Sequence, residues 1–289
     1  MEPLHEVTKQ ELPILYEWLQ KHLPNAYKLY GSVQHELKGR WPGARYFTLG
    51  WPEIRAVGDG PVDESLSKCP KFFNHVRHLN VYGPDLADVE ELVRRPEFVD
   101  WSKPVLTHAN CYQSADVLEK ISKETGTPYN KRTRTQLMIA YPEDIKPCPV
   151  PEGFEVRPID PHRQAEYITS TWPHRRKFTE SYISAMLESF HSVGIFDRDG
   201  NLAAFELENE YEFSALLHVK DEYRGLGLAK CVVSLLAQKF FQENRPILAA
   251  VIASNKPALA LHEQLGFKTI SYLDWFVHSM TAEKVMASG

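Results

Sequence analysis

The chain has 289 residues, about twice the length of a common single domain, so we expect two domains. Hydrophobic residues make up 43% of the sequence and charged residues 25%, which is ordinary for a folded protein and excludes extensive disorder. The 38 acidic residues outnumber the 33 lysines and arginines, and the formal net charge is -5. This mild acidity argues against a protein that chiefly binds nucleic acid, which usually needs a basic surface.

The sequence also predicts where the protein works. No apolar run is long enough to span a bilayer, and the longest, Ile247–Ala253, fits a buried strand instead. Residues Met1–Val7 have the character of neither a secretory signal nor a transit peptide. The four cysteines are far apart, without zinc-finger or disulfide-framework spacing, and Cys231 is interpreted as a buried thiol on the inner face of a helix. We therefore expect an intracellular protein, cytoplasmic in preference to mitochondrial, and leave the oligomeric state open.

A proline-rich stretch divides the chain. Residues Tyr141–Pro151 contain closely spaced prolines, which fix φ and remove backbone donors, so neither a helix nor a central strand is expected there. We predict an N-terminal domain over residues 1–141, a linker over 142–152 and a second domain over 153–289.

The N-terminal half alternates helical and strand patterns and predicts a mixed α/β domain. Thr8–Glu11 has the pattern of a capping box before a helix of leucines spaced by three and four residues. The pair His75 and His78 lacks a third ligand, so we predict no metal site. The strands expected here are Tyr27–Val33, Tyr46–Leu49, His78–Tyr82 and Gln136–Tyr141, and the further helices are Asp85–Arg95 and Ser114–Glu124.

The C-terminal half predicts a strand, two helices, a hairpin and then alternating strands and helices. Asp199-Gly200 marks the hairpin turn, because both residues tolerate positive φ. The expected helices are Pro161–Thr171, Thr179–Phe190, one beginning near Gly227, and Lys256–Leu265. The expected strands are Phe154–Pro158, Val193–Asp197, Leu202–Leu207, Phe213–Val219, Ile247–Ala253 and a final pair within Thr269–Ser279.

The most informative segment is Val219–Ala229, between a predicted strand and an amphipathic helix. A glycine-containing turn at a helix N-terminus exposes unpaired N–H groups, and these suit a pyrophosphate. Gly225 and Gly227 let the backbone approach the phosphates, and Arg224 adds charge or holds the loop. The alternative is that the glycines merely end a strand.

The helix Lys256–Leu265 carries an ionisable group on its apolar face. Asn255 is placed as its N-cap, Pro257 lies in the first turn, and Gly266 follows its end. His262 shares a face with Ala258, Leu261 and Leu265. It is either a core histidine bonded to a backbone carbonyl or part of a site.

Together these segments resemble the GNAT acyltransferase superfamily, which uses acyl-coenzyme A. Arg224–Ala229 matches its pyrophosphate motif, and Ala258–Phe267 is similar to its "LYEKLGF" segment. Leu23–Val33, with Trp51-Pro52 beyond it, looks like the opening of the glycine N-acyltransferase family, and Pro96–Trp101 and Glu222-Tyr223-Arg224 are also similar to that family. The resemblance implies a GNAT acyltransferase fold (mixed α/β) in the C-terminal half, preceded by a smaller α/β companion domain.

The function that this resemblance implies is transfer of an acyl group from acyl-CoA to the amine of glycine or another amino acid, without a metal. Its partners are then small molecules, with no nucleic acid and no membrane span. Two alternatives are an acetyltransferase for a biogenic amine or a protein lysine, and a CoA-binding protein without catalysis.

The resemblance also implies the site residues. The thioester carbonyl and coenzyme are expected at Leu217, His218, Val219, Arg224, Gly225, Leu226, Gly227, Leu228, Ala229 and Asn255. His262 replaces the family's tyrosine and is expected to protonate or orient the sulfur, with an expected loss of about 10²-fold in turnover on substitution by alanine. The family's basic glutamate aligns with Phe213, so the base is assigned to Glu212, with Glu210 and His218 left open. Trp172 and Phe178, which flank clustered cations, are expected to border the acceptor.

Overall fold

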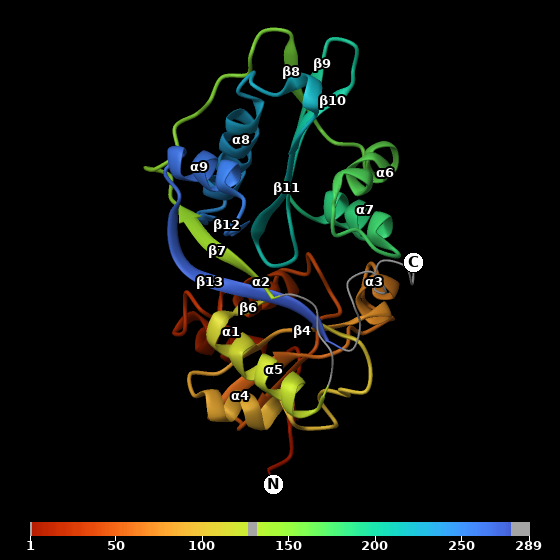
Figure 1. Ribbon diagram of the computed structural model, residues 1–289, viewed down its shortest axis with the longest axis vertical. Coiled ribbons are helices and arrows are strands. Elements are labelled where there is room, and N and C mark those ends of the chain that lie inside the picture. The colour runs from red at the N-terminus through yellow and green to blue at the C-terminus, as the bar shows by residue number, and fades with distance from the viewer. Residues whose placement is uncertain (1, 127–131, 279–289) are drawn as a thin grey trace. The chain divides into compact units, whose positions relative to one another are not determined.

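The computed structural model describes residues 2–126 and 132–278 (Figure 1). Its chain divides into two compact units. The N-terminal unit comprises Met1–Thr135, Arg176–Thr179 and Ser271–Gly289, and the C-terminal unit comprises Gln136–Arg175 and Glu180–Ile270. These units differ from the predicted ranges 1–141 and 153–289, because two strands, β7 (Thr133–Ala140) and β13 (Lys268–His278), each contribute residues to both.

The N-terminal unit contains a four-stranded antiparallel sheet in the order β1-β2-β3-β5. A second set of strands places β4 parallel to β6, with β13 antiparallel on the other side of β6. The strands are β1 (His5–Glu6), β2 (Tyr46–Leu49), β3 (Ala56–Asp59), β4 (Arg77–Leu79), β5 (Val81–Tyr82) and β6 (Val105–Cys111). The helices are α1 (Leu12–Gln20), α2 (Tyr27–Leu37), α3 (Pro70–His75), α4 (Leu86–Val93) and α5 (Tyr112–Glu124).

Three predictions for this half need correction. The expected strand Tyr27–Val33 is part of α2, because Leu29 and Val33 lie one helical turn apart and pack in one cluster with the leucines of α1. The expected strand His78–Tyr82 is divided at Asn80 into β4 and β5, which belong to different sheets. The Thr8 N–H and hydroxyl both donate to the Glu11 carboxylate at 2.8 Å, but α1 begins after Glu11, so this bond precedes the helix instead of capping it.

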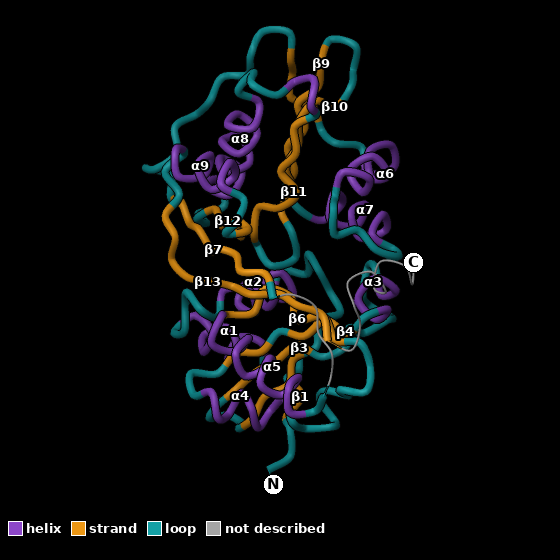
Figure 2. Tube along the Cα trace, in the orientation of Figure 1, coloured by secondary structure: helices purple, strands orange, loops and turns teal. Residues whose placement is uncertain are grey.

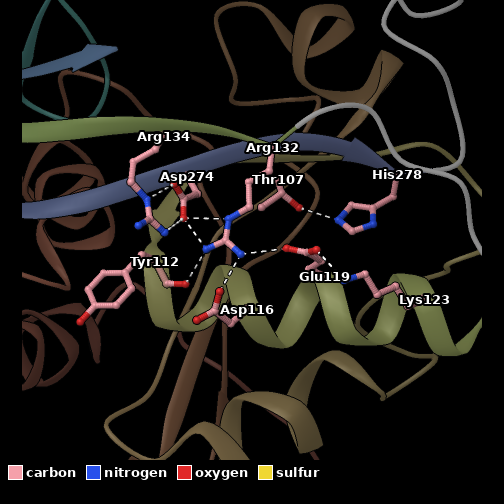
Figure 3. Close-up of polar contacts among 9 residues, drawn as sticks. All are labelled: Thr107, Tyr112, Asp116, Glu119, Lys123, Arg132, Arg134, Asp274 and His278. Atoms are coloured by element: carbon pink, nitrogen blue, oxygen red, sulfur yellow. Dashed lines mark hydrogen bonds and ion pairs between the residues drawn. The ribbon is translucent and has the colours of Figure 1, made fainter. Parts of the chain in front are cut away.

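A buried carboxylate holds β13 within the N-terminal unit (Figure 3). Asp274 is fully buried and accepts hydrogen bonds from the guanidinium groups of Arg132 and Arg134, at 2.9 Å and 3.0 Å from their Nε atoms. Arg132 also donates to Asp116 and Glu119 of α5, at 2.6 and 2.9 Å. The last strand of the chain is therefore tied to the start of β7 and to α5.

The C-terminal unit is built on strands in the order β13-β7-β12-β11-β10-β9-β8. Strands β8 to β11 are antiparallel to their neighbours, and β11 and β12 are parallel. The new strands are β8 (Phe154–Arg157), β9 (Ser192–Asp197), β10 (Leu202–Glu208), β11 (Phe213–Val219) and β12 (Ile247–Ile252). The helices are α6 (Pro161–Thr171), α7 (Thr179–Ser189), α8 (Leu228–Gln242) and α9 (Lys256–Gln264).

Helices cover both faces of β9, β10 and β11, with α8 on one side and α6 and α7 on the other (Figures 1 and 2). Cys231 lies on the inner face of α8 and is fully buried in the core, which confirms the prediction of a buried thiol. The two strands expected within Thr269–Ser279 are one continuous strand, β13, because no glycine or proline interrupts the run and a register shift between Asp274 and Phe276 absorbs the irregularity. Ser279 lies outside the described residues. No helix within residues 2–126 and 132–278 is long and apolar enough to cross a membrane.

Candidate functional site

Strands β11 and β12 pair only at their beginnings. The parallel register joins Phe213 to Leu248 and Ser214 to Ala249, and β11 is buried up to Ser214. From Ala215 to Val219 the strand is half-exposed, although it is an interior member of the sheet. Backbone groups of an interior strand that lose their neighbour can pair with a ligand instead. The segment Leu217–Val219 therefore has the accessibility that a thioester-binding strand needs.

An irregularity in β11 starts this divergence. Phe205 of β10 faces His218, whereas Leu207 faces Ala215, so β11 has one more residue than β10 between these pairs. Leu216, in this interval, has a positive φ of 61°. Such a bulge bends the strand and redirects the side chains that follow it.

The glycine loop leads from β11 into α8. Gly225 and Gly227 both have a φ of +81°, and Gly227 is the N-cap of α8 without a side-chain hydrogen bond. A Cβ atom at either glycine would have no heavy atom within 4 Å, so open space surrounds the loop. The first N–H groups of α8 have no partner within the helix, and the positive end of its dipole is directed at this space. This arrangement is suited to a pyrophosphate.

The other loop residues differ in what they offer. Leu226 is half-exposed, whereas the Leu228 side chain is buried in the core, which leaves its backbone N–H as its contribution. Arg224 is exposed and pairs with Asp221 at 2.7 Å, so part of its charge is already compensated. Ala229 is half-buried in the first turn of α8.

Asn255 and His262 are both engaged in the structure of α9. The Asn255 Oδ1 accepts a hydrogen bond from the Ala258 N–H at 3.2 Å, which confirms its prediction as the N-cap. His262 is 4% exposed, and its Nδ1 donates to the Ala258 carbonyl oxygen at 2.8 Å. A neutral imidazole with a proton on Nδ1 has a lone pair on Nε2. Burial lowers the pKa of His262, so the ring is neutral at pH 7 and has no second proton for a leaving thiolate.

Glu212 is held by a buried ion pair. It precedes β11, with a φ of +62°, and its carboxylate lies 3.2 Å from the Arg245 guanidinium. Arg245 also contacts Glu208 at 2.8 Å and lies over the ring of Phe240. The Glu212 carboxylate is therefore already engaged by a buried cation.

Two further glutamates of the same segment are also buried. Glu210 accepts a hydrogen bond from the Tyr182 hydroxyl at 2.5 Å. Glu206 is 1% exposed on β10, and burial raises its pKa to about 8, so it is mostly protonated at neutral pH. Glu206 and the contacts of Arg245 were not among the residues predicted from the sequence. Glutamates at four alternate positions from 206 to 212 in an apolar segment were the available signal, because buried carboxylates need a buried cation or a proton.

His218 is the most accessible of the three candidates for the base. It is half-exposed on the diverging part of β11, and its ring stacks on Phe205 at 5.4 Å, with Tyr167 of α6 at 6.4 Å. Partial burial, and secondarily Arg224, lowers its pKa. The ring is therefore neutral at pH 7 and able to accept a proton.

The two residues expected at the acceptor belong to different compact units. Trp172 ends α6 in the C-terminal unit and contacts Tyr182, with ring centroids 6.3 Å apart. Phe178 belongs to the N-terminal unit, has a φ of +66° and contacts His75 edge to face. Among the described residues, no group of three or more His, Cys, Asp or Glu side chains is arranged to hold a metal ion.

Two family descriptions match this chain. The family of aralkyl acyl-CoA:amino acid N-acyltransferases matches residues 1–175, and the description "FR47-like protein" matches residues 192–276. Glycine N-acyltransferase of Bos taurus is 22% identical over 89% of this chain and 92% of its own length. Glycine N-phenylacetyltransferase of Bos taurus is 20% identical over 86% of this chain and 89% of its own. Glycine N-acyltransferase of Mus musculus is 26% identical over 85% of this chain and 88% of its own.

Solved structures share the fold. A Drosophila protein superposes with a TM-score of 0.82 at 16% identity, over 95% of this chain and 97% of that one. A GCN5-related N-acetyltransferase from Sphaerobacter thermophilus superposes with a TM-score of 0.56 at 15% identity, over 96% of both chains.

Proposed function

The chain belongs to the aralkyl acyl-CoA:amino acid N-acyltransferase family, and on that premise we propose that it acylates glycine or another amino acid where β11 and β12 diverge. The protein is an acyl-CoA-dependent N-acyltransferase with a GNAT fold. The observation that carries the assignment of the site is the continuity of a half-exposed, bulged strand with an open glycine loop at the N-terminus of α8.

The coenzyme is proposed to lie along this strand and loop. Backbone N–H groups of Gly225, Leu226, Gly227, Leu228 and Ala229 would hold the pyrophosphate, with Arg224 at its side. The thioester arm would pair with the backbone of Leu217–Val219, and an N–H there would polarise the carbonyl. The space around both glycines supports this role, because bound phosphates need close approach to the backbone.

The chemistry requires a neutral amine and a proton acceptor. The amine nitrogen attacks the thioester carbonyl carbon, the C–S bond breaks, and the amine proton leaves to a base. We assign this base to His218, directly or through one water, because it is neutral, half-exposed and on the diverging strand. Glu212, which is already paired with Arg245, remains the second candidate. The resulting imidazolium of His218 can return its proton to the departing thiolate.

The overall reaction is tested with the purified full chain. Benzoyl-CoA or a long-chain acyl-CoA is mixed with a panel of amino acids while free thiol is measured. Thiol release that depends on an amino acid supports the proposal. Release only with biogenic amines or lysine peptides would move the acceptor to another class, and no release with any acceptor would reject catalysis.

The base is tested by His218→Asn with Glu212→Gln as the matched comparison. We expect His218→Asn to lower kcat by about 10²-fold, the low end for a general base. In the wild type, kcat/KM should fall as the pH decreases through the lowered pKa of His218, because protonation of His218 removes the acceptor. That acidic decline should disappear in His218→Asn. If Glu212→Gln instead causes the large loss and alters the pH profile, the base is Glu212.

The co-substrate is CoA-based, and we propose acyl-CoA itself, with no metal. Trp172 is proposed to border the amino acid acceptor on the C-terminal unit. The same role is proposed for Phe178 from its position in the chain alone. An intracellular location is also proposed, supported by the wide spacing of the four cysteines. Fractionation of cells expressing the tagged protein would test this location.

A further inference from the structure

The glycine loop has little to hold it in its binding conformation. Both glycines have positive φ, neither is enclosed by neighbours, and Leu226 between them is 50% exposed. A loop that must present several N–H groups in one arrangement loses affinity if it has to be ordered on binding. Its conformation must therefore be set by residues at its ends.

One end of the loop is fixed by Tyr223, which directly precedes Arg224. The Tyr223 hydroxyl donates to Asp197 Oδ2 at 2.5 Å, and its ring contacts Phe154 edge to face at 5.6 Å. Asp197 ends β9 at the β9–β10 hairpin. A single side-chain bond thus joins the loop to this hairpin.

Asp197 is itself immobilised by the hairpin turn. Its carboxylate accepts hydrogen bonds from the backbone N–H groups of Asp199 and Asn201, at 2.9 and 2.8 Å, and from the Asn201 side-chain amide at 2.9 Å. The bonds from Tyr223 and Asn201 hold the pKa of Asp197 well below its usual range, and Asp197 raises the pKa of Tyr223 to about 12. The acceptor is therefore ionised and the donor protonated throughout the physiological range.

We propose that Tyr223 and Asp197 are positioning residues for coenzyme A, whose hydrogen bond presets the glycine loop to receive the pyrophosphate. This inference rests on the proposed function, because it takes the loop as the pyrophosphate site. Neither side chain needs to touch the coenzyme: the hydroxyl bond limits the directions in which Arg224 and Gly225 follow the short 3-10 helix Asp221–Tyr223. Loss of this hydrogen bond should therefore lower the affinity for coenzyme A and leave the rate of the chemical step unchanged.

The test compares two thioesters in the full-length enzyme. Tyr223→Phe keeps the ring against Phe154 and removes only the hydroxyl. We expect KM for acyl-CoA to rise about fivefold, the range of one lost hydrogen bond, while kcat stays within about twofold. Acyl-pantetheine, which has the same thioester but no nucleotide and no pyrophosphate, should react with unchanged kcat/KM.

Two further variants separate positioning from general stability. Asp197→Ala removes the acceptor and should also raise KM for acyl-CoA, and adding Tyr223→Phe to it should raise KM no further, because the hydroxyl has already lost its partner. Asp199→Asn alters the same turn but keeps the hydrogen bond between Tyr223 and Asp197, and it should leave kcat/KM for both thioesters unchanged.

Three outcomes would overturn the inference. If Tyr223→Phe loses as much kcat/KM with acyl-pantetheine as with acyl-CoA, the bond is purely structural. An unchanged KM in Tyr223→Phe, with normal coenzyme binding by the wild type, would show that the loop needs no such support. If the wild type itself uses both thioesters equally well and binds free CoA no better than pantetheine, the loop is not a pyrophosphate site, and the proposed function of the loop fails together with the inference.

Discussion

The chemistry of His262 depends on the hydrogen bond that its ring already makes. Sequence position alone favoured a proton donor to the sulfur, at the place of the family's tyrosine. The bond from Nδ1 to the Ala258 carbonyl oxygen leaves only a lone pair at Nε2, and burial lowers the pKa of the ring. His262 packs against Phe267, and we expect the thiolate to obtain its proton from another group.

This assignment predicts a small catalytic effect of His262→Ala. Turnover should fall less than about tenfold, below the usual contribution of a general acid. The thermal midpoint should fall clearly, because a buried ring is lost from the core. Steady-state kinetics and thermal unfolding measure the two effects separately. A loss of about 10²-fold in kcat with an unaltered midpoint would restore His262 as the acid.

At the scale of elements, β11 and the start of α8 each contain a conformation that ordinary residues avoid. The bulge at Leu216 lies within β11, and the positive φ of Gly227 is at the N-cap of α8. The space around Gly227 is open, so a methyl group there meets no neighbour and acts only through φ. Strain and ligand binding can therefore be separated experimentally.

Gly227→Ala should cost about 1 kcal/mol of stability through its left-handed conformation. It should also raise KM for acyl-CoA by about tenfold or more, because the added Cβ lies where the phosphates approach. The control is Gly39→Ala in the N-terminal unit, where φ is +65° and a Cβ would meet no heavy atom within 4 Å. We expect the two variants to lose similar amounts of stability and only Gly227→Ala to raise KM for acyl-CoA. If KM for acyl-CoA is the same in both variants, the loop is not the pyrophosphate site.

For the molecule as a whole, the N-terminal unit is not a continuous stretch of chain. Its strands include β13 from Ser271 onward, and Phe276 lies in the same core cluster as Leu79 and Leu118. Asp274 supplies the carboxylate for Arg132 and Arg134 (Figure 3). A fragment that stops at the proline-rich stretch lacks both contributions.

We therefore expect the fragment of residues 1–141 to fail to fold by itself. Its core loses a fully buried aromatic side chain, and the two arginines lose their buried partner, which together cost several kcal/mol. Circular dichroism should show no cooperative thermal transition, and amide resonances should be poorly dispersed. Addition of a peptide spanning residues 268–289 should restore order. A cooperative transition in the fragment alone would contradict this dependence on β13.

Local sequence patterns determined most of the C-terminal elements and the glycine loop. The hairpin at Asp199-Gly200, the cap at Asn255 and helix α6 depend on residues that are close together in the chain, and all three were predicted correctly. The prediction of a strand over Tyr27–Val33 was wrong because the spacing of its apolar residues fits both a strand and a helix, and packing against α1 selects the helix.

Only the tertiary structure decided which groups at the site are available for chemistry. Glu212 meets Arg245, Tyr223 meets Asp197, and Asp274 meets Arg132 and Arg134, and each of these pairs joins segments far apart in the sequence. A side chain's motif specifies its residue type and its neighbours in the chain, but its basicity and freedom depend on the partners that folding brings to it. The sequence by itself therefore determined the family and most of the C-terminal elements, whereas folding decided which carboxylates are paired, which histidine is accessible and which strands complete each unit.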